Sequence, residues 1–522
     1  MSGTSTSQRA TSSRGYGFLW HNPATGRAEF ATNITRWTAD ATAQLDYWIT
    51  AGDSPREILA RYADATGHSP DFPEWASGFW QCKLRYRTQD ELLAVAREYK
   101  ARGLPLSCIV IDFFHWTRMG EWKFDPAEWP DPDAMMAELR AMDVETMVSI
   151  WPTVQTNAQT WPEMRERGYL MKTERGAPVT NVYPDKHPLA SHFCTYYDAT
   201  NPEARRYVWN KARESYVRHG IANFWIDSCE PELRPNHPEQ VRLMLGNGAE
   251  VLNAYPYLHI EGFREGLTEA GHQDGVLLVR SAWAGSQRHG VILWSGDVWS
   301  TWHDFRAQIT AGLHSGLSGL GWWTTDIGGF YEGIGKSAEF RELLVRWFQF
   351  GVFSPVCRLH GFRVPDDLPL PNDGVPTYGE DTFRIFTATG GANEVWSYGE
   401  RLYAIFVDLL FLRERIRPYI MAQFAEHARS GAPVMRPLFF DFPADPPCWD
   451  AADSYMLGPD LLVAPVVEPG ATSRAVYLPR GARWRCAWTE AEHEGGVTVM
   501  ADAPLERIPL YLRDGAVLPI VA

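Results

Sequence analysis

The chain has 522 residues and a mass of 59.2 kDa, which exceeds one ordinary domain of ~100–200 residues. Hydrophobic residues make up 45% and charged residues 22%, a globular composition that excludes a mainly disordered protein. The formal net charge of −15 repels phosphate backbones, and no basic stripe is interleaved with aromatic residues. We therefore expect no nucleic-acid partner.

Cysteine usage and apolar runs bear on the compartment. The seven cysteines are scattered and lack CxxC pairs or zinc-ligand spacing, which predicts free thiols in a reducing compartment. Residues 1–14 form a Ser/Thr-rich leader, expected to be disordered, without the apolar core of a signal peptide. No apolar run reaches the roughly 18 residues of a membrane span. We expect a cytoplasmic protein with no membrane partner, and the sequence leaves open whether it is a homo-oligomer.

Residues 15–70 are predicted to form the end of an antiparallel β-sheet and a connecting helix. Short β segments over 15–50 are separated by turns, one of them at Asn22-Pro23. Ser54 then provides a helix cap, Pro55 takes the first helical position and Glu57 the third.

From about residue 75 to 361, apolar runs alternate with helical patterns, as in repeated βα units. The clearest helical patterns cover 88–102, 132–142 and 202–219. The alternation predicts an α/β protein with a (β/α)8 TIM barrel, to which we assign residues 71–428. The polar stretch 163–200 either covers the barrel mouth or is a passive surface excursion. The eight apolar runs are 75–82, 106–114, 145–154, 222–228, 275–283, 291–297, 319–328 and 353–361.

The pattern changes after the last of these runs. Residues 393–428 predict one or two helices, with Arg413, Arg415 and Arg417 on the polar side. Residues 429–522 show short alternating apolar and polar runs punctuated by Pro and Gly, which predicts a C-terminal β-sandwich packed on the barrel.

In a (β/α)8 barrel the carboxyl ends of the strands converge on one pocket. Some residues at such ends could instead cap helices or form ion pairs, and Asp326 could equally shape a turn with the glycines that follow it. The predicted strand ends bring acids, a guanidinium, an imidazole and an indole to the same mouth: Asp112, Trp151, Asp227, Arg280, Asp297, Asp326 and His360.

Asp227 and Asp297 end the fourth and the sixth run and can face each other across the mouth. Glycoside cleavage needs one group that protonates the leaving oxygen and another that meets the developing oxocarbenium ion. The 23 tryptophans fit sugar stacking and core packing alike. The pair of carboxylates therefore predicts glycoside hydrolysis.

Other chemistries lack their motifs. The segment 316–320 (GLSGL) lacks the second glycine of a nucleophile elbow, and 246–248 lacks the third glycine of a dinucleotide loop. There is no Walker lysine motif and no HExxH spacing, so we expect no cofactor and no metal. Cys229, two positions after Asp227, is interpreted as a small buried residue.

Four parts of the chain are similar to sequence motifs of a known family: 225–231 (WIDSCEP), 280–288 (RSAWAGSQR) with 294–297 (WSGD), 323–330 (WTTDIGGF) and 358–361 (RLHG). With them the chain resembles glycoside hydrolase family 31 from about residue 15 to 520. That family comprises retaining α-glycosidases, among them α-glucosidases and α-xylosidases. The resemblance implies that Asp227 is the nucleophile and Asp297 the general acid/base.

The resemblance also implies binding roles. Asp112 would hydrogen-bond the far hydroxyls of the sugar in the −1 subsite, and His360 and Arg280 would hold the 2- and 3-hydroxyls. Residues 15–70 resemble the last segment of the family's N-terminal β-sandwich, and 429–522 its proximal C-terminal sandwich. A distal sandwich is not recognisable, which leaves open whether the chain is a fragment. The other implied substrate-binding residues are Trp151, Trp225, Trp294, Asp326 and Phe330.

Phe113 and Phe114 follow Asp112 and are bulkier than their counterparts in typical α-glucosidases. Their rings could fill the space of a sugar's C6 hydroxymethyl group, or they could face the barrel core. The first interpretation favours an exo-acting α-xylosidase with a small α-xyloside as substrate. An α-glucosidase or α-transglycosylase is the alternative within the family. A non-catalytic sugar-binding protein is the alternative outside it, and the presence of both aspartates argues against that.

Overall fold

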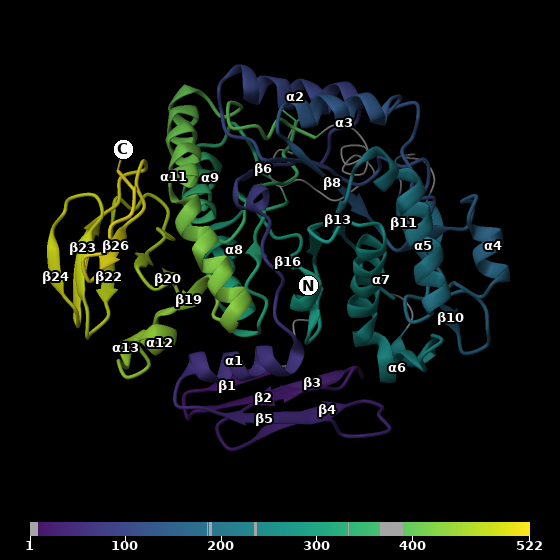
Figure 1. Ribbon diagram of the computed structural model, residues 1–522, viewed down its shortest axis with the longest axis horizontal. Coiled ribbons are helices and arrows are strands. Elements are labelled where there is room, and N and C mark those ends of the chain that lie inside the picture. Colours follow the sequence, from purple (N-terminus) through teal and green to yellow (C-terminus); the bar gives the residue numbers. More distant parts are fainter. Residues whose placement is uncertain are drawn as a thin grey trace.

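The computed structural model describes residues 9–184, 186, 191–233, 237–331, 333–365 and 390–521. Its central feature is a sheet of eight parallel strands that follow one another around a barrel (Figure 1). β17 and β18 stand at the two ends of this strand order. The N–H of Val356, just before β18, donates to the carbonyl of Trp323 in β17 over 3.1 Å, which closes the barrel. The strands are β6 (Phe79–Gln81), β7 (Cys108–Ile111), β8 (Glu145–Ile150), β13 (Asn223–Ile226), β15 (Leu277–Val279), β16 (Val291–Trp294), β17 (Trp323–Thr324) and β18 (Cys357–Leu359).

Burial explains why these strands read as continuous apolar runs. Every residue of the eight strands is buried except Glu145 at the start of β8. A parallel sheet has both faces covered, by helices outside and by packed side chains inside the barrel. Each of the eight predicted runs contains one of the strands, so the predicted (β/α)8 barrel is confirmed.

Helices surround the barrel. The three predicted helices are present as α2 (Gln89–Ala101), α3 (Pro132–Ala141) and α5 (Pro202–Ser215). A cap residue starts each one: Thr88, for example, accepts a hydrogen bond from the N–H of Glu91 over 3.2 Å. After α5 a 3-10 turn, η2 (Val217–His219), completes the predicted 202–219 segment. The remaining long helices are α7 (Tyr255–Glu269), α8 (Trp302–Leu317) and α9 (Ala338–Val352).

The polar stretch 163–200 belongs to a small β excursion between β8 and α5. Its strand β12 (Ser191–Tyr196) pairs antiparallel with β11 (Asn181–Pro184) on one side and with β9 (Thr153–Gln155) on the other. Tyr183 packs edge-on against Trp151, which directly follows β8, with ring centroids 5.3 Å apart. This contact favours the interpretation of a mouth cover. The excursion also holds α4 (Trp161–Glu166) and β10 (Lys172–Thr173), which pairs with β14 (Val241–Arg242).

At the amino-terminal end, two small antiparallel sheets lie beneath α1 (Pro55–Thr66) (Figure 1). Ser54 caps α1 through a hydrogen bond from the N–H of Glu57, as predicted. The expectation of disorder over residues 1–14 is wrong for Arg9–Ser12, because this segment forms β1 and pairs with β2. Residues 1–8 lie outside the described residues. The strands are β2 (Tyr16–Trp20), β3 (Gly26–Phe30), β4 (Thr35–Ala39) and β5 (Tyr47–Ala51).

A single helix, α11 (Glu400–Ser430), follows the barrel and packs beside α9 (Figure 1). The prediction that Arg413 lies on its polar side is wrong. Arg413 is fully buried and donates four hydrogen bonds of 2.6–2.8 Å to backbone carbonyls. The guanidinium is accepted in the core because neutral oxygens satisfy its donors.

The C-terminal part is an antiparallel six-stranded sheet with a second, two-stranded sheet, β22 and β25. The two sheets enclose an apolar cluster of their own that includes Leu478 and Trp484, in agreement with the predicted sandwich. No helix in the described ranges is long and apolar enough to cross a membrane. The elements are β19 (Met435–Pro437), α12 (Leu438–Asp441), α13 (Pro447–Asp450), β20 (Tyr455–Leu457), β21 (Leu461–Val463), β22 (Ser473–Leu478), β23 (Arg483–Cys486), β24 (Glu492–Glu494), β25 (Val497–Asp502) and β26 (Leu510–Arg513).

Candidate active site

The residues predicted at the strand ends do lie there. Asp112, Trp151, Asp227, Arg280 and His360 each occupy the first position after a barrel strand. Asp297 and Asp326 follow β16 and β17 by three and two positions, as counted from Trp294 and Thr324. The one barrel strand not yet accounted for is β6, and Cys82 occupies the first position after it. The sequence analysis did not consider Cys82 as a site residue. The same rule of reading strand ends would have found it.

Arg280 joins the two predicted catalytic carboxylates. Its Nε lies 3.6 Å from Asp227 Oδ1 and its Nη1 lies 3.1 Å from Asp297 Oδ2. A third acid, Glu230, accepts from Arg280 Nε over 2.6 Å. Tyr331 donates its hydroxyl to Asp297 Oδ2 over 3.5 Å. One guanidinium therefore contacts three carboxylates at one end of the barrel. Two of them come from the segment after β13 and one from the segment after β16.

The electrostatics of this cluster differ between its members. Burial raises the pKa of Asp227, Arg280 lowers it, and the charges of Asp297 and Glu230 raise it again, with a net value of about 7. Burial acts against the charge of Arg280, but the three acids outweigh it and raise the pKa of this guanidinium well above its usual value. The side chain of Asp297 is 32% exposed and that of Asp227 only 11%. The better solvated Asp297 is thus the carboxylate with access to water.

Asp112 and His360 meet deeper in the pocket. His360 Nε2 lies 3.7 Å from Asp112 Oδ2, and both residues are almost completely buried. Burial lowers the pKa of His360 well below its usual value, with Arg358 and Arg363 acting in the same direction, so the imidazole is neutral. Asp112 Oδ2 and both ring nitrogens of His360 have no hydrogen-bond partner among the residues that the structure describes. Buried polar atoms of this kind need a partner, and sugar hydroxyls are suitable ones.

Aromatic rings line the same end. Trp225 and Trp294 meet edge to face, with centroids 5.3 Å apart, and Trp225 contacts His360 at 5.0 Å. Phe330 also contacts His360, with ring centroids 5.5 Å apart. The guanidinium of Arg358 lies over the Trp225 ring at 5.1 Å. Trp225 and Phe330 thus contact the imidazole and Trp294 packs against Trp225, whereas Trp151, the fourth predicted wall residue, stacks on Phe113.

Asp326 makes a turn and an ion pair, the structural alternatives that the sequence left open for a residue at a strand end. Its carbonyl accepts from Gly329 N–H over 2.9 Å, which makes the predicted turn. Its carboxylate is fully buried and pairs with Arg358. Burial raises the pKa of Asp326 to about 6, although Arg358 lowers it. Asp326 thus positions a guanidinium behind the pocket wall.

Phe113 and Phe114 have different surroundings. Phe113 is half-buried and stacks on Trp151, with centroids 5.0 Å apart and planes 9° from parallel. Phe114 is 1% exposed and packs with Trp116 and Met119. Of the two rings, Phe113 is the one that borders the aromatic surface, and Phe114 supports it from behind.

Sequence reasoning missed three residues of the site: Glu230, Arg358 and Cys82. Glu230 and Arg358 lie inside stretches that carry the family resemblance, but neither stands at the end of a strand. Their contacts are made by loops and by a neighbouring strand, which residue spacing does not reveal. Only Cys82 had an available signal, its position at the end of an apolar run.

Comparison with known proteins agrees with this architecture. Residues 69–369 match the model of the glycosyl hydrolases family 31 TIM-barrel domain, and residues 431–518 match that of the family 31 C-terminal domain. An uncharacterized family 31 glucosidase of Pseudescherichia vulneris is 51% identical over 68% of this chain and 66% of its own length. An α-xylosidase of Saccharolobus solfataricus is 34% identical over 98% of this chain and 64% of its own length.

Solved structures give the same result. A family 31 α-xylosidase from a soil metagenome, complexed with xylose, has a TM-score of 0.90 and 52% identity, covering 98% of this chain and 74% of that one. A xylosidase from Aspergillus niger has a TM-score of 0.89 and 32% identity, covering 98% and 75%. This chain spans slightly less than two thirds of the curated relatives described above. On the family match and these identities, the chain belongs to glycoside hydrolase family 31.

Proposed function

We propose that this chain is a retaining, exo-acting α-glycosidase, and specifically an α-xylosidase. The observation that carries the proposal is the position of Arg280, whose guanidinium reaches both Asp227 and Asp297 at the mouth of the barrel. The names of similar proteins support the choice of substrate, since an α-xylosidase at 52% identity was solved with xylose.

In the proposed mechanism Asp227 attacks the anomeric carbon and forms a covalent glycosyl-enzyme, while Asp297 donates a proton to the leaving oxygen. Asp297 then removes a proton from a water molecule, which attacks the same carbon and releases the sugar from Asp227. Arg280 contacts both carboxylates and holds them at the same end of the barrel. Asp297 suits the acid/base role because its side chain is the more exposed of the two.

Substrate binding uses the buried polar atoms that lack partners. Asp112 Oδ2 and the ring nitrogens of His360 face each other at the base of the pocket and would bind hydroxyls of the sugar in the −1 subsite. Trp225, Trp294 and Phe330 would pack on its C–H faces. Binding of hydroxyls by these buried groups would suit the terminal sugar of a chain, which is the basis of the proposed exo action.

A panel of p-nitrophenyl α-xyloside, α-glucoside and α-galactoside tests the proposal directly. We expect the highest kcat/KM on the α-xyloside and labelling of Asp227 by a fluorosugar that traps the intermediate. Preference for the α-glucoside would favour the alternative, an α-glucosidase or transglycosylase. Binding of sugars without turnover of any member of the panel would favour a non-catalytic protein.

Phe113 provides a sharper test of the sugar preference. Its half-buried ring stacks on Trp151, and in the proposed enzyme it would occupy the volume of a glucoside's C6 hydroxymethyl group. Overpacking of this kind costs about 1–3 kcal/mol, or roughly 5- to 150-fold in specificity. Phe113→Ile should raise the kcat/KM ratio of α-glucoside to α-xyloside. Phe114→Ile is the matched control, since that ring packs behind, and it should lower stability and leave the ratio unchanged.

The cysteines support a proposed cytoplasmic location. All seven are free thiols, and six of them are buried. Free thiols persist in a reducing compartment. Fractionation of the source cells, with activity recovered outside the cytoplasmic fraction, would contradict this location.

A further inference from the structure

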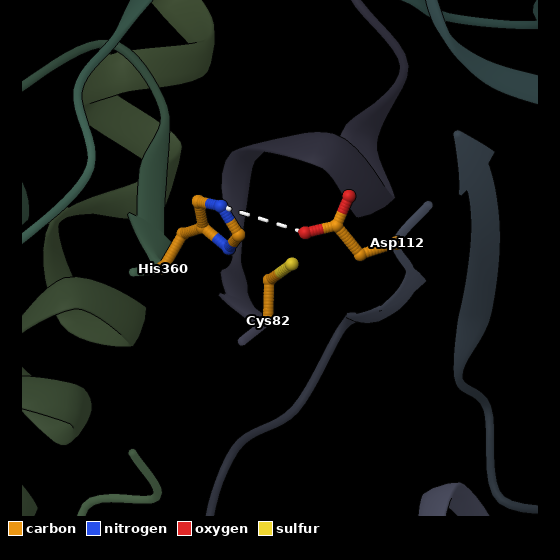
Figure 2. Close-up of side chains that lie close together, drawn as sticks. All are labelled: Cys82, Asp112 and His360. Atoms are coloured by element: carbon orange, nitrogen blue, oxygen red, sulfur yellow. Dashed lines mark ion pairs between the residues drawn. The ribbon is translucent and has the colours of Figure 1, made fainter. Parts of the chain in front are cut away.

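Three side chains with metal-binding atoms converge at the base of the pocket: Cys82, Asp112 and His360 (Figure 2). They follow β6, β7 and β18, which are neighbours in the barrel. One sulfur, one carboxylate oxygen and one imidazole nitrogen all lie within 4.8 Å of one another. Because the three residues are far apart in the sequence, their spacing does not predict a metal site.

The distances are close to those of a tetrahedral zinc site. Zinc binds sulfur at ~2.3 Å and nitrogen or oxygen at ~2.0–2.2 Å, so two ligand atoms of one ion lie about 3.3–3.6 Å apart. Asp112 Oδ2 and His360 Nε2 are already 3.7 Å apart. The Cys82 sulfur lies within 4.8 Å of the other two ligand atoms and would have to move closer to them when an ion binds. Three protein ligands leave one position for water.

The ligand atoms are also available. Asp112 Oδ2 and both His360 nitrogens are buried and have no hydrogen-bond partner in the described part of the chain. An imidazole nitrogen that makes no hydrogen bond can act as a metal ligand. In Figure 2 the Cys82 thiol points between the other two side chains. Thiolate, imidazole and carboxylate together match the borderline-soft character of zinc.

We propose that Cys82, Asp112 and His360 bind one Zn²⁺ at the base of the pocket, where the ion excludes the sugar. On binding, a bond forms between the Cys82 sulfur and the metal, and the thiol proton leaves to solvent. The ion's two positive charges are balanced by the Cys82 thiolate and the Asp112 carboxylate. The exclusion of sugar rests on the proposed function, because Asp112 and His360 are the proposed hydroxyl-binding groups, whereas the metal binding itself does not.

Direct binding measurements test the site without any activity assay. Equilibrium dialysis of the metal-free chain against Zn²⁺ should give one tightly bound ion, and Co²⁺ should produce the near-ultraviolet charge-transfer band of a cobalt–thiolate bond. Cys82→Ser should abolish this band and weaken Zn²⁺ binding by at least ~100-fold, since even partners outside the ligand set contribute about 10- to 100-fold. Absence of the cobalt–thiolate band in the unmodified chain would overturn the proposal, whether or not the variant folds.

Cys357→Ser is the matched control. Cys357 is a buried free thiol on β18, next to β6, but its sulfur faces α9 near Gly351. This variant should bind Zn²⁺ and Co²⁺ as the unmodified chain does. Equal loss of binding in both variants would show that the thiols act through stability and would contradict the assignment.

Kinetics then test the exclusion of the sugar. Zn²⁺ should raise the KM for p-nitrophenyl α-xyloside and leave kcat unchanged, with a much higher inhibition constant in Cys82→Ser than in Cys357→Ser. A lower kcat at unchanged KM would place the ion elsewhere. If the chain turns over no glycoside, the dialysis and the cobalt spectrum still decide the metal site, and only the proposed function fails.

Discussion

Buried arginines at two regions of the molecule differ in what surrounds them. At the barrel mouth, Arg280 has three carboxylates as neighbours, those of Asp227, Glu230 and Asp297. On the buried side of α11, the hydrogen-bond acceptors of Arg413 are all backbone carbonyls. The pKa values move in opposite directions: burial lowers that of Arg413 to about 10, whereas the acids raise that of Arg280. The acceptors of Arg413 are the carbonyls of Ser77, Val352, Ser354 and Pro355.

The difference separates a structural role from a catalytic one. Neutral carbonyls satisfy the donors of Arg413 and tie α11 to the barrel, which leaves one buried positive charge and no reactive group. Around Arg280, three carboxyl groups surround one guanidinium. The single positive charge does not compensate all three acids, which makes burial of the cluster costly. Such a cluster contributes little to stability and is retained for chemistry. Burial alone therefore does not identify a site; the charge of the partners does.

Replacing the proposed nucleophile should give the largest effect. Asp227→Asn removes the group that forms the covalent intermediate, and kcat should fall by about 10⁴-fold or more. The amide still accepts from Ser228 N–H, and Arg280 keeps two acids, so the fold should persist. Steady-state kinetics with thermal unfolding checks both points. Turnover close to that of the unmodified chain would remove Asp227 from the mechanism.

Asp297→Ala should reduce activity selectively. General acid catalysis contributes typically ~10²–10⁴-fold, and it matters most for a leaving group that needs protonation. We expect a large loss on a xylose-containing disaccharide and a much smaller one on a dinitrophenyl α-xyloside. Azide should restore the second step and yield a glycosyl azide. Equal losses on the two substrates would indicate a binding or structural aspartate.

Arg413→Met should show the reverse behaviour, a loss of stability with the chemistry retained. Four buried carbonyls lose their donor, which should lower the free energy of unfolding by about 2–4 kcal/mol. Arg401→Met is the control on the same helix, because its side chain is 71% exposed in an ion pair with Glu506 and should contribute at most about 1 kcal/mol. Urea unfolding and kcat below the transition measure both quantities. An Arg413 variant as stable as the Arg401 variant would break the comparison.

The same comparison explains how far the sequence could be interpreted. The eight strands were predictable because each is an apolar run with both faces buried, and the strand-end rule then located Asp227, Asp297 and Arg280. Arg413 was misassigned because its type indicates a solvent-facing residue. The carbonyls that satisfy it, such as those of Ser77 and Val352, are distant in sequence and are brought to it only by folding.

Within the site, the limit lay in side-chain environment. Sequence reasoning treated Phe113 and Phe114 alike, but the backbone of Phe114 adopts a left-handed conformation with φ of 63°. Adjacent residues on such a turn do not share a face, and one ring borders the pocket while the other enters the core. Cys82 was passed over for a different reason, since a cysteine at a strand end resembles any small buried residue.

The smallest expected effect is the pH dependence of the carboxylate-rich mouth. Asp227 must be ionised to attack, and burial raises its pKa from 3.8 to about 7. The value of kcat/KM should therefore rise roughly tenfold per pH unit up to about pH 7.

Stability should depend on the same proton. The folded chain binds the proton of Asp227 more tightly than the unfolded chain, so the contribution of this proton to the free energy of unfolding is full below the unfolded pKa and is lost as pH rises toward about 7. The thermal midpoint of Asp227→Asn should accordingly gain on that of the unmodified chain between about pH 4 and pH 7. A rate that stays flat down to pH 5, with parallel unfolding midpoints, would mean that Arg280 holds Asp227 ionised throughout.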